Sequence, residues 1–218
     1  MKTLIAIPCM DMIHTDFARA LLGLRLVGDT QYTFAQASLV YDARNTLANI
    51  ALSGDFDRVL WLDSDMLFDA GLLERLNADL DAGGIECVSA LYFSRKPPIK
   101  PVIYKRCFLD RSGEEAKPTA ECFADYPADA LFPIAGCGFG AVLMTTALLR
   151  RVRDTYGLPF SPALGFGEDL SFCLRVAELG EQIWCDSRAK CGHVGLAVYD
   201  ERSYARLTSN REEREGSP

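Results

Sequence analysis

The hydrophobic pattern of this chain alternates between strand-like runs and segments of helical spacing. Four segments have the length and character of strands, at residues 4–7, 31–36, 59–62 and 85–93. Three segments with apolar residues three and four apart separate them, at residues 13–24, 40–51 and 72–80. The first and third strand segments are continuously apolar, which is typical of strands covered on both faces. The alternation predicts an α/β fold, with helices flanking a mostly parallel central sheet joined by right-handed crossovers.

The second half of the chain is less regular. Residues 95–105 contain three prolines and several cations, which predicts a loop or extended chain. Residues 110–126 are polar and rich in turn formers, and either a hairpin or a mobile flap fits them. The remaining elements are a glycine-broken strand at 132–144, helices at 147–152 and 170–177, and a strand at 182–185. We expect one domain at residues 1–208 and a charged, flexible tail at residues 209–218.

Composition narrows the class of protein. A chain of 218 residues suits a single α/β domain. The net charge of −7 disfavours nonspecific binding to nucleic acid or anionic membrane. The eight cysteines are scattered and contain no Cys-x-x-Cys pair, which favours free thiols in a reducing compartment. Because no apolar run approaches the length of a membrane span, we expect a cytoplasmic protein.

The third strand segment ends abruptly in Asp63-Ser64-Asp65. Side chains two apart on an extended chain face the same way, so Asp63 and Asp65 can converge on one cation. Two carboxylates held so close are unfavourable unless a positive charge lies between them. Hard oxygen ligands suit Mg²⁺ or Mn²⁺. The alternative is that both aspartates are only helix-capping or turn residues.

Two further groups can carry chemistry. Glu168 and Asp169 follow a glycine-containing loop at the start of a predicted helix. A carboxylate facing a cleft there can act as a general base toward a hydroxyl, although favourable placement at a helix N-terminus explains the pair equally well. His193 lies between two glycines after the late strand. It is either structural or a further ligand beside the carboxylates, since a neutral imidazole suits Mn²⁺.

Arg44 and three closely spaced glycines complete the candidates. Arg44 opens the second helix, where it either offers donors to a phosphate or nucleoside group or is simply solvated. Gly136, Gly138 and Gly140 lack the Lys-Ser/Thr of a phosphate-binding loop, and an apolar strand follows them. We therefore interpret these glycines as opening room for a sugar or an acceptor.

The order of these motifs resembles a small GT-A glycosyltransferase, similar to the inverting family-two-like enzymes and their compact phage or bacterial relatives. The resemblance runs from about residue 3 to about residue 195. The motifs that carry it are the strand ending in Ile7-Pro8, then Ala43-Arg44-Asn45, Leu62-Asp63-Ser64-Asp65, the segment 136–144, Gly167-Glu168-Asp169 and His193. It implies a Rossmann-like sheet with a small antiparallel portion on the acceptor side.

The resemblance also implies roles for the matching residues. Asp63, Ser64 and Asp65 match the DxD motif that binds a divalent metal and the nucleotide diphosphate, with Asp65 as the direct ligand. His193 matches the histidine that completes the metal site, so that the metal set is Asp63, Asp65 and His193. Asp169, with Glu168, matches the acidic pair that supplies the catalytic base. The segments with Pro8-Cys9 and Arg44 match those that cradle the nucleotide.

The resemblance implies an enzyme that transfers a sugar from a nucleotide-sugar, with UDP-sugar as the expected donor, to an acceptor hydroxyl with inversion. A glycan, a protein, a lipid-linked sugar and a modified nucleobase all remain open as acceptors, and the oligomeric state is not readable. A processive polymerase is not expected, because the Gln-x-x-Arg-Trp signature is absent. The alternatives are a haloacid-dehalogenase-like phosphatase or phosphotransferase and a nucleotide-sugar-binding module without turnover.

Overall fold

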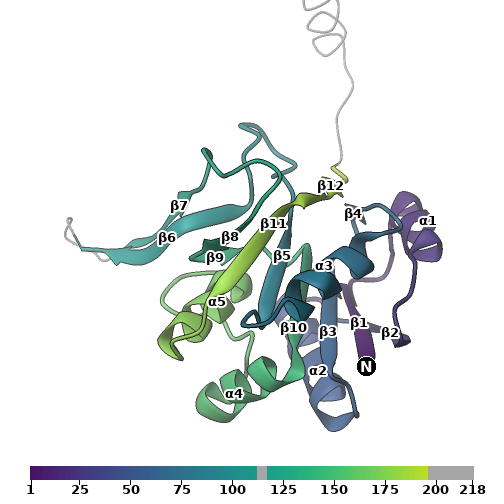
Figure 1. Cartoon of the computed structure of the whole chain (residues 1–218). Helices are drawn as coiled ribbons and strands as arrows, with labels where there is room; N and C mark the ends of the chain where they lie inside the picture. The colour runs from purple at the N-terminus through teal and green to yellow at the C-terminus, as the bar shows by residue number, and fades with distance from the viewer. Residues whose placement is uncertain (112–116, 196–218) are drawn as a thin grey trace, which may run out of the picture.

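The computed structural model describes residues 1–111 and 117–195, and Figure 1 shows the arrangement of their elements. A seven-stranded sheet forms the centre, in the order β2-β1-β3-β10-β5-β11-β8. Its strands are β1 Lys2–Cys9, β2 Asp29–Gln36, β3 Arg58–Leu62, β5 Cys87–Leu91, β8 Leu131–Ile134, β10 Ala141–Thr145 and β11 Ile183–Lys190. The expected tail at residues 209–218, and with it the domain boundary at residue 208, lies outside the described residues.

The central sheet is mostly parallel, as the sequence predicts. β1 pairs in parallel with β2 and with β3, and β11 pairs in parallel with β5. β10 lies antiparallel between β3 and β5, and β8 lies antiparallel at the edge beside β11. The insertion of β10 between two parallel strands was not predicted, because its apolar sequence fits any central position of the sheet.

Helices cover both faces of this sheet (Figure 1). They are α1 Thr15–Gly23, α2 Val40–Ser53, α3 Leu72–Asp81, α4 Thr146–Tyr156 and α5 Glu168–Glu178. On β1, Leu4 and Ala6 pack into one core with α2, α4 and α5, whereas Ile5 and Ile7 pack into the opposite core with α1 and α3. Full burial of each Leu or Ile contributes roughly 1.5–3 kcal/mol relative to exposure. The unbroken apolar run therefore reflects a strand with a core on each side.

Two smaller sheets build the rim of the molecule. One contains β6 Ile103–Asp110, β7 Lys117–Cys122 and β9 Gly136–Cys137, and the other contains β4 Met66–Leu67 and β12 Gly192–His193. The β6–β7 hairpin agrees with the hairpin alternative for residues 110–126. The prediction of one strand over residues 132–144 is wrong, because this stretch divides among β8, β9 and β10 in two sheets. The late strand is longer than predicted, since β11 reaches Lys190.

All eight cysteines are free in the structure. Within residues 1–111 and 117–195, no helix combines the length and the apolar character needed to cross a membrane.

A buried carboxyl pair joins α3 to β11. Arg188 Nη2 donates to Asp79 Oδ1 at 2.9 Å, and Arg188 Nε donates to Asp186 Oδ1 at 2.7 Å. The second oxygens of both carboxyls are buried and receive no hydrogen bond from the described residues. Burial and the charge of Asp186 raise the pKa of Asp79 from 3.8 to about 6, against the opposing charges of Arg188 and Arg75. A pKa shift of that size corresponds to a difference of roughly 2–3 kcal/mol between the interaction free energies of the protonated and the ionised carboxyl.

The pair makes stability depend on pH with a definite sign. Because the native state holds the Asp79 proton more tightly than the unfolded chain does, stability falls as the pH rises from about 4 to about 6. We expect Asp186→Asn to raise the free energy of unfolding by about 1 kcal/mol at pH 7.5 and to change it little near pH 4.5. The amide can donate to Asp79, while its oxygen still accepts from Arg188.

Urea denaturation at the two pH values measures this difference. Asp81→Asn is the matched control, because Asp81 lies on the same helix and its side chain is 61% exposed. Equal changes in the free energy of unfolding for Asp186→Asn at both pH values would contradict the raised pKa of Asp79.

Candidate functional site

The candidate residues meet in one cleft of about 590 Å³ at the carboxyl ends of β1 and β3. Ligands of open α/β sheets bind at this edge, beyond the ends of the strands. The predicted site residues that line the cleft are Pro8, Cys9, Arg44, Asp63, Ser64, Asp65, Glu168, Asp169 and His193. The structure thus brings together segments that are separated by more than a hundred residues of chain.

Arg44 lies at the centre of the acidic side chains. It comes from the first half of α2, and only 2% of its side chain is exposed. Its Nη2 donates to Asp63 Oδ1 at 2.7 Å, and its Nε donates to Glu168 Oε1 at 3.4 Å. The guanidinium carbon lies 5.3 Å from the ring centre of Phe139. Nη1 is buried and has no hydrogen-bond partner among the described residues.

The mutual effects of these charges are large. Burial lowers the pKa of Arg44, but the charges of Asp63, Glu168 and Asp169 outweigh it and the pKa is raised. Burial raises the pKa of Asp63, and the negative charges of Asp65 and Glu168 add to it, against the stabilising effect of Arg44. The sequence left open the alternative that Arg44 is simply solvated. The structure excludes this alternative, because Arg44 is buried among carboxylates.

A turn gives the two aspartates different partners. The Asp63 N–H donates to the Gly140 carbonyl at 3.0 Å, and the Met66 N–H donates to the Asp63 carbonyl at 3.1 Å. The chain is therefore turning, not extended, through the DxD segment. Asp63 binds Arg44, whereas Asp65 forms ion pairs with Arg95 and, through Oδ2, with His193 Nε2 at 3.4 Å.

Backbone pairing explains why His193 reaches Asp65. β12 pairs with β4, which places Gly192 opposite Leu67 and His193 opposite Met66. The Val194 N–H also donates to the Asp65 carbonyl at 2.8 Å. His193 Nδ1 lies 3.0 Å from the Phe93 carbonyl. Since a carbonyl only accepts, Nδ1 carries a proton, and Nε2 is the nitrogen presented to Asp65.

The electrostatics of this pair favour a charged carboxylate. Burial raises the pKa of Asp65, but the hydrogen bond and charge of His193, with the charge of Arg95, outweigh it and hold the pKa below its usual value. The hydrogen bond with Asp65 raises the pKa of His193 against the effect of burial. Arg95 and His193 thus both face Asp65 Oδ2.

The metal-ligating side chains of the cleft can hold a divalent cation, but they provide few protein ligands. Across residues 1–111 and 117–195, no three His, Cys, Asp or Glu side chains converge closely enough to enclose a metal ion. Asp65 and His193 supply one carboxylate and one imidazole nitrogen; the carboxylate suits Mn²⁺ or Mg²⁺, and the imidazole favours Mn²⁺ of the two. Such ions commonly keep several waters and take further ligands from substrate phosphates. The carboxylate of Asp63, unlike that of Asp65, is bound to Arg44.

The second acidic pair opens α5. Gly167 is the N-cap and provides no side-chain cap, and Glu168 and Asp169 form the first turn. Burial raises the pKa of Asp169, with the charge of Glu168 adding to the shift. A carboxyl with a raised pKa at a cleft can accept a proton from a hydroxyl more readily than an ordinary aspartate. Placement at the helix N-terminus partly offsets the cost of the negative charges.

The cleft also contains residues that the sequence did not assign to the metal, the nucleotide or the catalytic base. Tyr92 is buried and its hydroxyl accepts from the Gly140 N–H at 3.3 Å, which links β5 to the turn before β10. Phe139 packs against Arg44, and Arg95 contacts Asp65. Tyr92 follows a strand directly, so its position at a strand end was a usable signal. The contact of Arg95 depends on a proline-rich loop whose path no pattern predicts.

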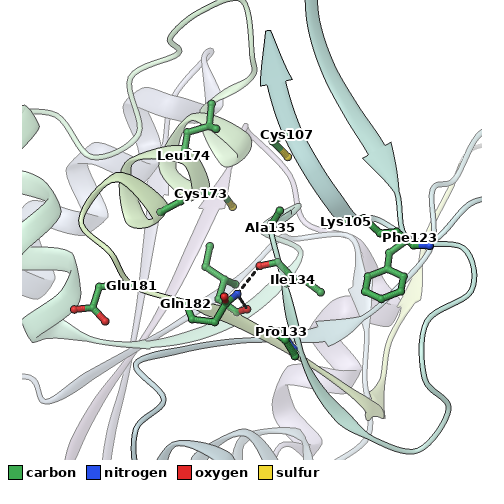
Figure 2. Close-up of a pocket in the computed structure, with 12 residues that line it drawn as sticks. Lys105, Cys107, Phe123, Pro133, Ile134, Ala135, Cys173, Leu174, Glu181 and Gln182 are labelled. Atoms are coloured by element: carbon green, nitrogen blue, oxygen red, sulfur yellow. Dashed lines mark hydrogen bonds between the residues drawn. The ribbon is translucent and has the colours of Figure 1, made fainter. Parts of the chain in front are cut away.

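A second cavity, of about 420 Å³, lies between α5 and the β6–β7 hairpin (Figure 2). Its polar groups are already engaged, since Gln182 Nε2 donates to the Ile134 carbonyl at 2.8 Å and Glu181 pairs with Arg151. Burial raises the pKa of Cys107 to about 11, which leaves its thiol a weak nucleophile at neutral pH. None of the predicted site residues lines this cavity. The chemistry-bearing groups are therefore concentrated in the other cleft.

Replacement of the positively charged Arg44 side chain by a neutral one tests the electrostatic arrangement of the cleft. We expect Arg44→Met to lower the free energy of unfolding by about 3 kcal/mol or more, because it leaves buried carboxylates uncompensated. The loss should be larger at pH 8 than at pH 5, since protonation relieves the repulsion. Arg153→Met, which removes a surface pair with Asp154, should stay within about 0.5 kcal/mol in the same urea titrations. A loss for Arg44→Met that is small at both pH values would contradict this role.

Comparison with known proteins finds similarity in structure alone. No protein-family model matches the chain, and no curated protein matches it in sequence. A197 from STIV is similar over 90% of this chain and 87% of its own, with a TM-score of 0.63 and 18% identity. GalNAc-T7, solved with UDP, GalNAc and Mn²⁺, is similar over 95% of this chain, with a TM-score of 0.62 and 11% identity.

A third similar structure is S. aureus TarS 1-349, over 89% of this chain, with a TM-score of 0.55 and 13% identity. This chain spans 48% of the GalNAc-T7 chain and 60% of the TarS chain. These likenesses, together with the sheet order and the flanking helices, confirm the GT-A fold expected from the sequence.

Proposed function

We propose that this protein is a metal-dependent glycosyltransferase, which moves a sugar from a nucleotide-sugar donor to an acceptor hydroxyl. The observation that carries the proposal is the single cleft in which the Asp65–His193 pair and the Asp169 carboxyl both lie. A haloacid-dehalogenase-like reaction needs a free aspartate as nucleophile. The engagement of Asp63 by Arg44 and the GT-A fold both argue against that alternative.

The donor is proposed to be a UDP-sugar, held near the ends of β1 and β3. Pro8 and Cys9 end β1 at the cleft, and Arg44 also lines it, with a buried Nη1 that has no hydrogen-bond partner among the described residues. The presence of UDP and Mn²⁺ in the similar GalNAc-T7 structure supports this choice of nucleotide and metal. Ser64, between the two aspartates, is proposed to contribute a further hydrogen bond to the nucleotide.

Asp65 and His193 would hold Mn²⁺ or Mg²⁺ together with oxygens of the diphosphate. A bound divalent cation neutralises the negative charge that develops on the departing nucleoside diphosphate. The Phe93 carbonyl orients the His193 ring so that Nε2 faces this position. Asp63, bound to Arg44, is proposed to act from the ribose side or through the water shell of the metal.

Asp169 is proposed as the catalytic base, with Glu168 as its neighbour. Asp169 takes the proton of the acceptor hydroxyl while the hydroxyl oxygen bonds to the anomeric carbon, and the bond from that carbon to the diphosphate oxygen breaks. Attack on the face opposite the leaving group inverts the configuration. Glu168 is bound to Arg44, which leaves Asp169 as the carboxyl of the pair without an arginine partner among the described residues.

The metal assignment is tested by calorimetry of UDP binding with and without Mn²⁺. We expect Asp65→Asn to weaken Mn²⁺-dependent UDP binding by about tenfold or more, since it removes the anionic ligand. Asp55→Asn is a matched control, because Asp55 is exposed in the loop between α2 and β3. Binding that needs no metal and is unchanged in Asp65→Asn would refute the assignment.

The base assignment is tested by UDP release from UDP-sugars in Mn²⁺, with water as the acceptor. We expect Asp169→Asn to lose about 10²–10⁴-fold in rate while UDP affinity stays within about twofold, because general-base catalysis contributes that much. Glu168→Gln should lose less. Retained release in Asp169→Asn would move the base to another residue. Tight UDP binding without turnover of any UDP-sugar by the unmodified protein would favour the non-catalytic binding module.

A further inference from the structure

Arg95 contacts the oxygen that the proposed metal would need. Arg95 Nη1 forms an ion pair with Asp65 Oδ2, and His193 Nε2 lies 3.4 Å from the same oxygen. The Arg95 side chain is 47% exposed, in contrast to the buried Arg44. Arg95 therefore occupies the position beside Asp65 where the proposed metal ion would bind. Its half-exposed side chain reaches this position from the solvent side of the cleft.

The backbone around Arg95 is anchored while the side chain has room to move. The Ser94 N–H donates to the Lys100 carbonyl at 2.8 Å, and Ser94 Oγ accepts from the Lys100 N–H at 3.1 Å, which closes the base of the loop. Gly195 approaches so closely that a Cβ there would lie 3.1 Å from Arg95 Cβ. The guanidinium can therefore change partner by rotating its side chain about a backbone that is held on both sides.

A neighbouring cavity provides space for a displaced guanidinium. This cavity measures about 400 Å³ and shares Arg95 and His193 with the main cleft. Its other lining residues are Phe93, Ser94, Ile99, Cys191, Gly192 and Gly195. No acidic side chain is among them, so within residues 1–111 and 117–195 a guanidinium that leaves Asp65 meets no carboxylate in this cavity and would favour an anionic group of a bound ligand.

We propose that Arg95 is an exchangeable counter-ion: it neutralises Asp65 when the cleft is empty, yields Asp65 to a divalent cation, and then binds the diphosphate of the donor. This inference rests on the proposed metal site at Asp65 and His193. Its consequence is thermodynamic coupling between metal and nucleotide. Metal alone must displace Arg95 and leave it unpaired, whereas metal with a diphosphate gives Arg95 a new anionic partner.

Mn²⁺ titration followed by the electron paramagnetic resonance signal of free Mn²⁺ tests the proposal without any turnover. We expect Arg95→Ala to bind Mn²⁺ alone about fivefold more tightly than the unmodified protein, since a half-exposed ion pair no longer competes. The increase in Mn²⁺ affinity that UDP produces should shrink by a similar factor in the variant. Arg95→Lys, which keeps the charge, should lie between the two.

Arg106→Ala is the matched control, because it removes one positive charge from an exposed pair with Glu121 on the β6–β7 hairpin. Both variants should keep the circular dichroism spectrum of the unmodified protein. Mn²⁺ affinity that depends on Asp65 but is equal in Arg95→Ala and Arg106→Ala would overturn the role of Arg95 and leave the proposed metal site in place. Mn²⁺ affinity that is absent, or unaffected by Asp65→Asn, would overturn the proposed metal site and this inference with it.

Discussion

One buried guanidinium holds the acidic cleft together. Arg44 comes from α2, whereas its partners Asp63 and Glu168 come from the end of β3 and the start of α5. Taking a charge out of water costs several kcal/mol, and only close opposite charges and satisfied donors offset it. The carboxylates in turn could not lie so close together without a cation among them. The position of each group therefore depends on the presence of the others.

The backbone supports this arrangement at the edges of the sheet. The Asp63 N–H is bound to Gly140 beside β10, and Asp65 is joined to Val194 just after β12. The short pairing of β12 with β4 carries His193 back to the end of β3. Main-chain hydrogen bonds thus fix where the acidic turn and the histidine lie, and the side chains need only choose rotamers. Precise placement of this kind is what a metal or phosphate site requires.

The two arginines of the cleft differ in burial and consequently in what they can do. Arg44 is enclosed by carboxylates and aromatic rings, so its charge is a permanent part of the site. Arg95 is half-exposed and has a single acidic partner among the described residues, so a competing cation can replace it at low cost. Under the proposed function, the two arginines would have different tasks: Arg44 keeps the acids in place, and Arg95 changes partner when the donor arrives.

The layered α/β architecture and the segments of the cleft could be predicted from the amino-acid sequence. Continuous apolar runs demand cores on both faces of a strand, as at Ile5 and Ala6, and polar groups that end such strands must gather at one edge of the sheet. The partners could not be predicted and are known from the folded chain: β10 between β3 and β5, the turn that separates Asp63 from Asp65, and the contacts of Arg44 and Arg95. Periodicity reports which face of an element is buried, whereas the pairing of charges depends on distances between elements remote in the chain, which no local pattern encodes.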